Sequence, residues 1–472
     1  MRRLLILAAA VALVAGCGNG GTKQAASSGG GASGAAVAPR SAAFFVELDT
    51  SFDSAQWEAF QTLLRKFPDG DKLFSSIGGD NTSLEDLKAA LGSETDVVAM
   101  TADDADKNVF VGLTQPDDPA KLDTLLAKDT TPSVSEPIED WRAIADDRAT
   151  LDRFKQARNG GTLADDPSYK DAASSLPADA LAGIYIDGAV LTKAIDQQAK
   201  TGTGPVPGVG RIGWVAGALS AKAQGFLLDL RIKGDEIEAT PFTAELPSEV
   251  PADVSLFLDF KGLNSFLDEL KRNPAVEKQL GSAQQALGGL LDEVIGLFAG
   301  EGAVYVRPGG GKSEYTLVLK VADETKAKAS LDKLATLVGA LAQKAPEPVR
   351  VGRVSAQLIA LGDSGDLYYA VFDGKLVVTN GAGGITGLSS SQHLADSQGW
   401  RDATAAAEIP DQTAGILYAD VQELVRLGKS MSSDSNPITP EVERNATPLR
   451  TALIYGSIDG DIVSIKGFVS VR

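Results

Sequence analysis

Hydrophobic and polar residues alternate in several short segments of this chain, most clearly over 315–320 and 458–470. A period of two is typical of strands in an antiparallel sheet with one face covered. Asp-Gly pairs at Asp373-Gly374 and Asp459-Gly460 favour tight hairpin turns between such strands. Other stretches have the apolar spacing of amphipathic helices, as in 57–64. The pattern therefore predicts an α+β fold.

The pattern of the first half recurs in the second. Residues 163–172 match 394–403, and residues 176–187 match 409–420 with small gaps. We predict two similar domains in tandem, at 39–246 and 247–472, each a largely antiparallel sheet covered by amphipathic helices. Whether the two sheets merge into one is left open by the sequence.

The first sixteen residues have the composition of a bacterial export signal. Two arginines precede an apolar run over 4–14, which is too short to span a bilayer because that needs roughly 20 apolar residues. The following Val14-Ala15-Gly16-Cys17 resembles the lipobox of bacterial lipoproteins. That resemblance implies cleavage between Gly16 and Cys17 and a lipid on the Cys17 thiol. The alternative is an ordinary secretory signal with a chance cysteine.

Residues 17–38 consist mainly of Gly, Ala and Ser. Such a segment buries too little apolar surface to fold, so we predict a flexible tether that reaches roughly 25 Å on average. The predicted location is the extracytoplasmic face of the cell membrane, with the lipid on Cys17 as the attachment.

Composition excludes several kinds of function. The net charge is −19, and removal of the signal peptide makes it more negative still. We therefore expect no nucleic-acid partner and repulsion from anionic headgroups. Cys17 is the single cysteine, so thiol catalysis and ordinary Cys/His metal sites are also excluded. We expect no cofactor and no metal.

A shorter unit occurs four times: a proline, an apolar strand and then an aspartate before a helix. The four strands end at Asp49, Asp187, Asp259 and Asp420. We predict that each aspartate caps the following helix by accepting from its free N–H groups. The alternative is that the four carboxylates gather at one ligand site.

Other motifs favour structural roles. His393 is the single histidine, and we expect it to be a polar loop residue rather than a general base. Residues 103–106, with three aspartates, are predicted to be a solvated hairpin loop rather than a calcium site. The glycines of 308–312 are predicted to form a β-hairpin loop rather than a phosphate loop, and those of 381–384 a structural turn.

Three segments resemble an uncharacterised family of bacterial lipoproteins known as DUF3352. They are the strand ending at Asp49, the helix that contains Trp57 and ends in Arg65-Lys66-Phe67-Pro68, and residues 163–169. The resemblance covers nearly all of the chain after the tether. It implies no activity, cofactor or catalytic residue.

We therefore expect a membrane-anchored binding or scaffold lipoprotein without catalytic activity. Its ligand would be a lipid, a cell-envelope polymer or another protein, held in a groove between the two domains. One alternative is a carboxylate-based hydrolase that acts on envelope glycans, which needs two acidic residues in one cleft and a raised pKa on one of them. Another is a purely structural protein, with an exposed apolar patch and no deep cavity.

Overall fold

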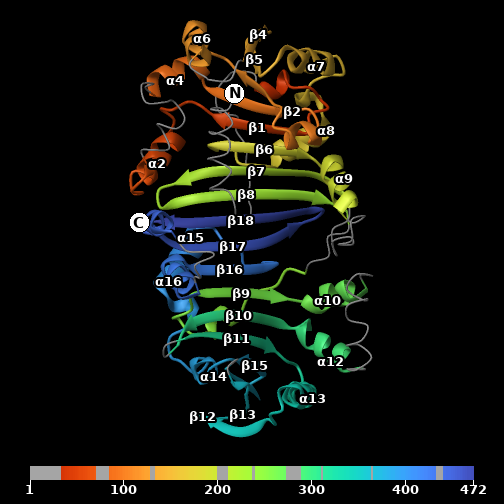
Figure 1. Cartoon of the computed structure of the whole chain (residues 1–472), viewed down its shortest axis with the longest axis vertical. Coiled ribbons are helices and arrows are strands. Elements are labelled where there is room, and N and C mark those ends of the chain that lie inside the picture. Colours follow the sequence, from red (N-terminus) through yellow and green to blue (C-terminus); the bar gives the residue numbers. More distant parts are fainter. Residues whose placement is uncertain are drawn as a thin grey trace.

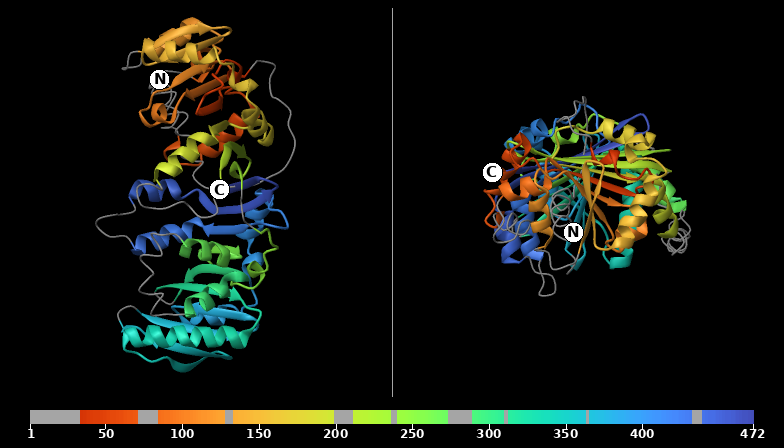
Figure 2. Two further views of the ribbon diagram at one scale, coloured as in Figure 1. Left: turned by 90° about the vertical axis from the view of Figure 1, so that its right-hand side faces the viewer. Right: turned by 90° about the horizontal axis from the view of Figure 1, so that it is seen from above.

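The computed structural model describes residues 33–70, 84–127, 133–198, 211–235, 240–272, 289–309, 312–362, 365–431 and 439–472. Its strands form one 18-stranded sheet in which every pairing is antiparallel (Figure 1). The molecule is elongated, because the strands are stacked along its long axis (Figures 1 and 2). The predicted α+β class with antiparallel pairing is confirmed.

The first half contributes eight strands to this sheet. They are β1 (Phe44–Asp49), β2 (Glu94–Ala99), β3 (Val111–Thr114), β4 (Val134–Ile138), β5 (Trp141–Ala145), β6 (Ala182–Asp187), β7 (Ile212–Lys222) and β8 (Gly225–Gly234). Their order across the sheet is β4-β5-β3-β2-β1-β6-β7-β8. The chain thus starts in the middle of this half and adds strands on both sides.

The second half contributes ten strands. They are β9 (Leu256–Lys261), β10 (Glu301–Pro308), β11 (Ser313–Lys320), β12 (Glu347–Val351), β13 (Val354–Ala360), β14 (Asp366–Phe372), β15 (Lys375–Thr379), β16 (Gly415–Asp420), β17 (Leu449–Asp459) and β18 (Ile462–Val471). Their order is β12-β13-β14-β15-β11-β10-β9-β16-β17-β18. From β9 onward the pairings follow the order seen from β1 onward, with one additional hairpin.

The two halves join where β8 lies beside β18 (Figure 1). Ser470 pairs with Gly225 at one end of this seam, and at the other end the Gly234 N–H donates to the Asp461 carbonyl at 3.1 Å. Between these ends lies a buried charge cluster, in which Asp229 is 3.0 Å from Arg231 and 3.9 Å from Lys466. Burial lowers the pKa of the Lys466 ammonium. The β8–β18 seam therefore combines these buried charges with apolar side chains such as Phe226 and Phe468.

Helices follow the strands of the first half. They are the 3₁₀ turns η1 (Gly34–Ala36) and η2 (Leu163–Asp165), and the helices α2 (Ala55–Leu64), α4 (Leu84–Leu91), α5 (Ala102–Asp106), α6 (Pro119–Ala127), α7 (Arg148–Arg158), α8 (Pro167–Ser175) and α9 (Gly188–Gln198). Phe45 and Trp214 pack with η1, η2 and α7 in one cluster, whereas Leu48 packs in another with Trp57 of α2. Because Phe45 and Leu48 point to opposite faces of β1, both faces of the sheet are covered. The prediction of one covered face was wrong.

The second half is built in the same way. Its helical elements are η4 (Leu246–Ser248), α10 (Leu263–Arg272), α12 (Leu290–Gly296), η5 (Leu297–Ala299), α13 (Glu324–Ala342), α14 (Ala382–Gly387), η7 (Leu394–Asp396), α15 (Gln398–Ala406), α16 (Val421–Met431) and α17 (Pro440–Ala446). Phe257 and Trp400 belong to a core on one face, and Leu319 and Leu331 to a core on the other. The Asp-Gly turns are present as predicted, with φ of 49° and 70° at Asp373 and Gly374.

Residues 33–38 are part of the folded body, which corrects the predicted end of the tether at residue 38. The side chains of Ala35, Val37 and Ala38 are buried. Gly34 lies so close to the sheet that a Cβ there would come within 1.7 Å of Asp96 Oδ2. Small residues suggested a linker, but here their size allows η1 to pack directly against the sheet.

Candidate functional site

Four carboxyl groups project from one face of β1 and β2. Glu47 faces Asp96 across the two strands, and Asp49 faces Glu94. Alternate residues of a strand share a face, so all four lie on the side that also carries Phe45. We call Glu47, Asp49, Glu94 and Asp96 the acidic cluster. Like charges in directly opposed positions destabilise a sheet, which makes this arrangement costly.

Asp96 is the deepest member of the acidic cluster. It is 0% exposed, and neither of its carboxyl oxygens meets a hydrogen-bond donor. Burial, with Glu94 and Glu47 nearby, raises the pKa of Asp96 well above its ordinary value. The group is satisfied when it is protonated and donates to Glu94, which lies beside it.

The other three members differ in their partners. Glu94 accepts from the Gly34 N–H at 2.8 Å, and Asp49 accepts from Ser51 N–H at 2.8 Å and Ser54 Oγ at 2.7 Å. Glu47 has no hydrogen-bond donor in the described part of the chain. Burial, together with the carboxyl groups of Glu94 and Asp49, raises the pKa of Glu47 to about 7. Burial also raises the pKa of Glu94 and of Asp49.

A cavity of about 570 Å³ opens beside the acidic cluster. Glu47, Asp49 and Glu94 line one wall. Another part of the lining comes from α8 and the residues after it, with small or apolar side chains that include Leu176 and Pro177. All lining residues belong to the first half, so the cavity is not the groove between two domains that the sequence suggested. It offers a charged wall and an apolar wall to one small molecule.

The described residues supply no cation to this cluster. None of its four carboxyl groups forms an ion pair with a lysine or arginine of the described ranges. In the same ranges, no three His, Cys, Asp or Glu side chains converge in a way that would hold a metal ion. The negative charge of the site is therefore uncompensated by these residues.

The family model described as "Protein of unknown function (DUF3352)" matches residues 120–453, which is well over half of the chain. The chain belongs to the DUF3352 family. The resemblance noted from the sequence is thereby confirmed, and membership assigns no activity to the acidic cluster.

Comparison with solved structures gives weak similarity only. Crystal forms I and IV of a protein titled TP0453 are 8% and 11% identical to this DUF3352 chain, each with a TM-score of 0.26. They cover 45% and 50% of this chain, and 83% and 94% of their own. At that TM-score the likeness supports no structural argument. No curated protein matches the sequence.

Among the described residues, none of the helices combines the length and hydrophobicity needed to cross a bilayer. The predicted lipidation and cleavage residues, Gly16 and Cys17, lie outside the described residues.

The four strand-ending aspartates do not converge. Asp49 and Asp187 lie at opposite ends of the paired strands β1 and β6, because these strands are antiparallel. Asp187 and Asp420 accept from the first turns of α9 and α16, at 2.9 Å and 3.0 Å, as predicted for helix caps. Asp259 differs, since it is buried in mid-strand and neither of its oxygens has a hydrogen-bond partner. The capping prediction was wrong for Asp259. It was also wrong for Asp49, because Ser54 caps α2 by accepting from the Trp57 N–H.

The remaining motifs have structural roles. Residues 103–106 belong to the short helix α5, not to the predicted hairpin loop, and Asp104 pairs with Arg153 at 3.0 Å. β10 and β11 pair as neighbouring antiparallel strands, as a hairpin requires, and Gly310 and Gly311 lie outside the described residues. His393 precedes η7, where its backbone N–H donates to Asp396 at 3.3 Å.

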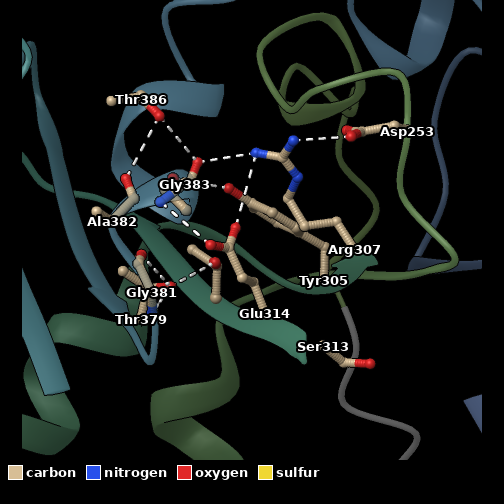
Figure 3. A network of polar contacts seen from close by, with 12 residues as sticks. Asp253, Tyr305, Arg307, Ser313, Glu314, Thr379, Gly381, Ala382, Gly383 and Thr386 are labelled. Carbon is tan, nitrogen blue, oxygen red and sulfur yellow. Dashed lines mark hydrogen bonds and ion pairs between the residues drawn. The ribbon is translucent and has the colours of Figure 1, made fainter. Parts of the chain in front are cut away.

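The glycines at 381–384 begin α14, where Arg307 and Glu314 meet the helix (Figure 3). Arg307 donates to the Gly383 carbonyl at 2.9 Å and to Asp253 at 2.7 Å. A Cβ on Gly383 would lie 2.2 Å from a Glu314 oxygen. The segment is therefore a close-packed structural contact that only glycine fits.

The acidic cluster was missed by the sequence analysis, although a signal was present. Glu47 and Asp96 each occupy a strand position in phase with a buried neighbour, Phe45 and Val98 respectively. A charged residue in the buried phase of a strand is uncommon and often functional. What the sequence did not contain was the register that places the two residues side by side.

Proposed function

We propose that this DUF3352 protein is a non-catalytic binding protein that holds a small cationic molecule in the cavity of its first half. The observation that carries the proposal is the acidic cluster, which borders a cavity and has no cation among the described residues. A buried carboxylate without a partner is costly, so a bound cation would relieve the unfavourable charge.

The dimensions and lining of the cavity support a small organic ligand. Its volume of about 570 Å³ falls within the range of roughly 300–1,000 Å³ that is usual for ligand pockets. Its alanines, Leu176 and Pro177 would contact an apolar part of the ligand, while Glu47 would pair with the charge. The scaffold alternative expected no deep cavity, and the cavity therefore favours binding.

We further propose that the protein acts on the extracytoplasmic side of the membrane, tethered by a lipid on Cys17. The lipobox-like residues 14–17 and the apolar run before them support this location. We also propose that the two halves are tandem similar domains. The matching order of strand pairings from β1 and from β9 supports duplication of one ancestral unit.

Native mass spectrometry on the full lipidated chain, isolated from a bacterial envelope, tests the binding function. We expect a reproducible added mass in the wild type and its loss in Glu47→Gln. Glu58→Gln is the matched control, because Glu58 is an exposed residue of α2 away from the cavity. A bare mass for the wild type under conditions that preserve folding would refute the proposal.

A second candidate is the carboxylate-based hydrolase of envelope glycans. It is favoured by one observation: Glu47, with its pKa raised to about 7, lies two residues from Asp49 in the same cavity. However, glycosidases place their two carboxyl groups on either side of the scissile bond, whereas here the three carboxyl groups that line the cavity project from one face of β1 and β2. Release of reducing ends from peptidoglycan fragments, abolished by Glu47→Gln, would establish the hydrolase and displace the binding function.

A further inference from the structure

The second half repeats part of the setting of the acidic cluster: Glu47 and Glu94 have carboxyl counterparts, whereas Ala303 and Lys261 occupy the positions of Asp96 and Asp49. Asp259 of β9 occupies the position of Glu47, because each lies two residues after a phenylalanine that packs on an aromatic ring of a helix. The ring centroids of Phe45 and Tyr169 of α8 are 5.8 Å apart, and those of Phe257 and Trp400 of α15 are 6.0 Å apart. Both aromatic pairs meet edge to face. The equivalence therefore rests on strand position and on the packing around it.

Glu94 at the start of β2 and Glu301 at the start of β10 are equivalent as well. Glu94 Oε1 accepts from the Gly34 N–H at 2.8 Å, and Glu301 Oε1 accepts from the Leu246 N–H at 2.8 Å. Gly34 and Leu246 each begin a 3₁₀ turn, η1 and η4. Each half thus holds a glutamate against the backbone of the 3₁₀ turn at its start.

The second half supplies a cation to its carboxyl groups from its own chain. Lys320, the last residue of β11, has its Nζ 2.9 Å from Glu249 and 3.4 Å from Glu301, and it also pairs with Glu245. Its charge acts on Asp259 too, because it counteracts part of the rise in the pKa of that group. The ammonium group of Lys320 therefore interacts electrostatically with four carboxyl groups.

Gln115 stands at the position of Lys320 in the first half. Thr95 and Gly302 are equivalent, because each follows one of the equivalent glutamates. Thr95 pairs with Thr114 and Gly302 pairs with Leu319, so the next residues along the chain, Gln115 and Lys320, are equivalent too. Gln115 lines the cavity. Of the four carboxyl groups near Lys320, Asp259 and Glu301 have carboxyl counterparts in the first half, Glu47 and Glu94. The first half lacks the ammonium group, because Gln115 replaces Lys320.

We infer that the ligand of the cavity is a primary amine, whose ammonium group takes the place in the first half that Lys320 Nζ takes in the second. This inference rests on the proposed function and names its ligand class. Glu47, which lines the cavity and has no hydrogen-bond donor among the described residues, is a further sign that the site lacks a donor. A primary ammonium provides three donors, and its alkyl chain would lie against Leu176 and Pro177.

The test compares three probes of equal length, n-hexylamine, 1-hexanol and hexanoate, by calorimetric titration of the full lipidated chain at pH 8. We expect hexylamine to bind at least about tenfold more tightly than hexanol, because a charge-assisted hydrogen bond is lost in the alcohol. We expect no detectable binding of hexanoate. Equal binding of hexylamine and hexanol would overturn the amine assignment and leave the binding function standing. If none of the three binds and the native mass is bare, both proposals fall.

A variant tests the equivalence with Lys320 directly. Gln115→Lys should weaken hexylamine binding by about tenfold or more, since a lysine of the chain would then supply the ammonium. Gln115→Met is the matched control of similar length without charge, and it should keep affinity within about threefold. Thermal unfolding of each variant confirms folding. Unchanged hexylamine affinity in folded Gln115→Lys would overturn the inference.

Discussion

Replacement of Asp259 by asparagine isolates the free-energy cost of a buried carboxyl group at this strand position. Asp259 is 0% exposed, and the nearby Phe260 N–H does not reach it with hydrogen-bond geometry. Burial, together with the charge of Glu301, raises its pKa from 3.8 to about 8. A carboxyl group with a raised pKa in the folded state destabilises that state as the pH rises from the unfolded to the folded pKa.

The magnitude follows from the width of that pH range. At 1.36 kcal/mol per pH unit, a rise from 3.8 to about 8 removes roughly 5 kcal/mol of wild-type stability between pH 4 and pH 8. The asparagine side chain does not titrate, so Asp259→Asn should gain up to that amount relative to the wild type over the same range. The expected curve is a difference in unfolding free energy that grows steadily with pH.

Urea unfolding at pH 4, 6 and 8, followed by tryptophan fluorescence, measures this difference. Asp373→Asn is the matched control, because Asp373 is an exposed turn residue at positive φ, where asparagine is well tolerated. The wild type and Asp373→Asn should have parallel pH profiles. If Asp259→Asn is parallel to them as well, Asp259 does not titrate with a raised pKa and the reasoning about this buried position is refuted.

Three further predictions concern the cavity, the seam and the anchor. Hexylamine affinity should rise from pH 6 to pH 8 as Glu47 ionises around pH 7, and calorimetry on Glu47→Gln should show that this rise is lost. Asp229→Asn removes the carboxylate that pairs with Arg231 and Lys466, so the unfolding free energy from urea titration should fall by about 3 kcal/mol; a fall below about 1 kcal/mol would contradict the importance of the cluster. Cys17→Ala should release the protein from membranes on fractionation, and unchanged attachment would show that the lipid anchor is absent.

The strands could be predicted because their pattern is local. Alternation over 458–470 and the Asp-Gly turns identified hairpins that the structure contains. The single sheet could not be predicted, because β8 and β18 are far apart in the sequence and neither strand has a sequence feature that indicates pairing with the other. The covered second face was missed because side chains such as Leu48 and Phe45 occupy opposite phases of the same short strand.

The candidate site was hidden for a related reason. Asp49 was visible as the end of a strand, but the capping role predicted for it belongs to Ser54. Glu47 acquires its unusual environment only through Glu94 and Asp96, which lie far along the chain and reach it through strand register. Likewise, the correspondence of Gln115 with Lys320 depends on the equivalent pairings of β3 and β11, which the sequence does not contain.

The seam at β8 and β18 sets a condition on how this protein must be made. A chain that emerges from its N-terminus presents β8 as an open sheet edge until the residues of the last strand, 462–471, have arrived. An open edge invites pairing with other chains, and charged side chains on it discourage that. Asp229 and Arg231 provide such charges on β8 before β18 has been synthesised. Lys466 joins this charge cluster when β18 pairs with β8. Loss of β18 would therefore expose the edges of β8 and β17 in the middle of the molecule, so the continuity of the whole sheet depends on this one strand.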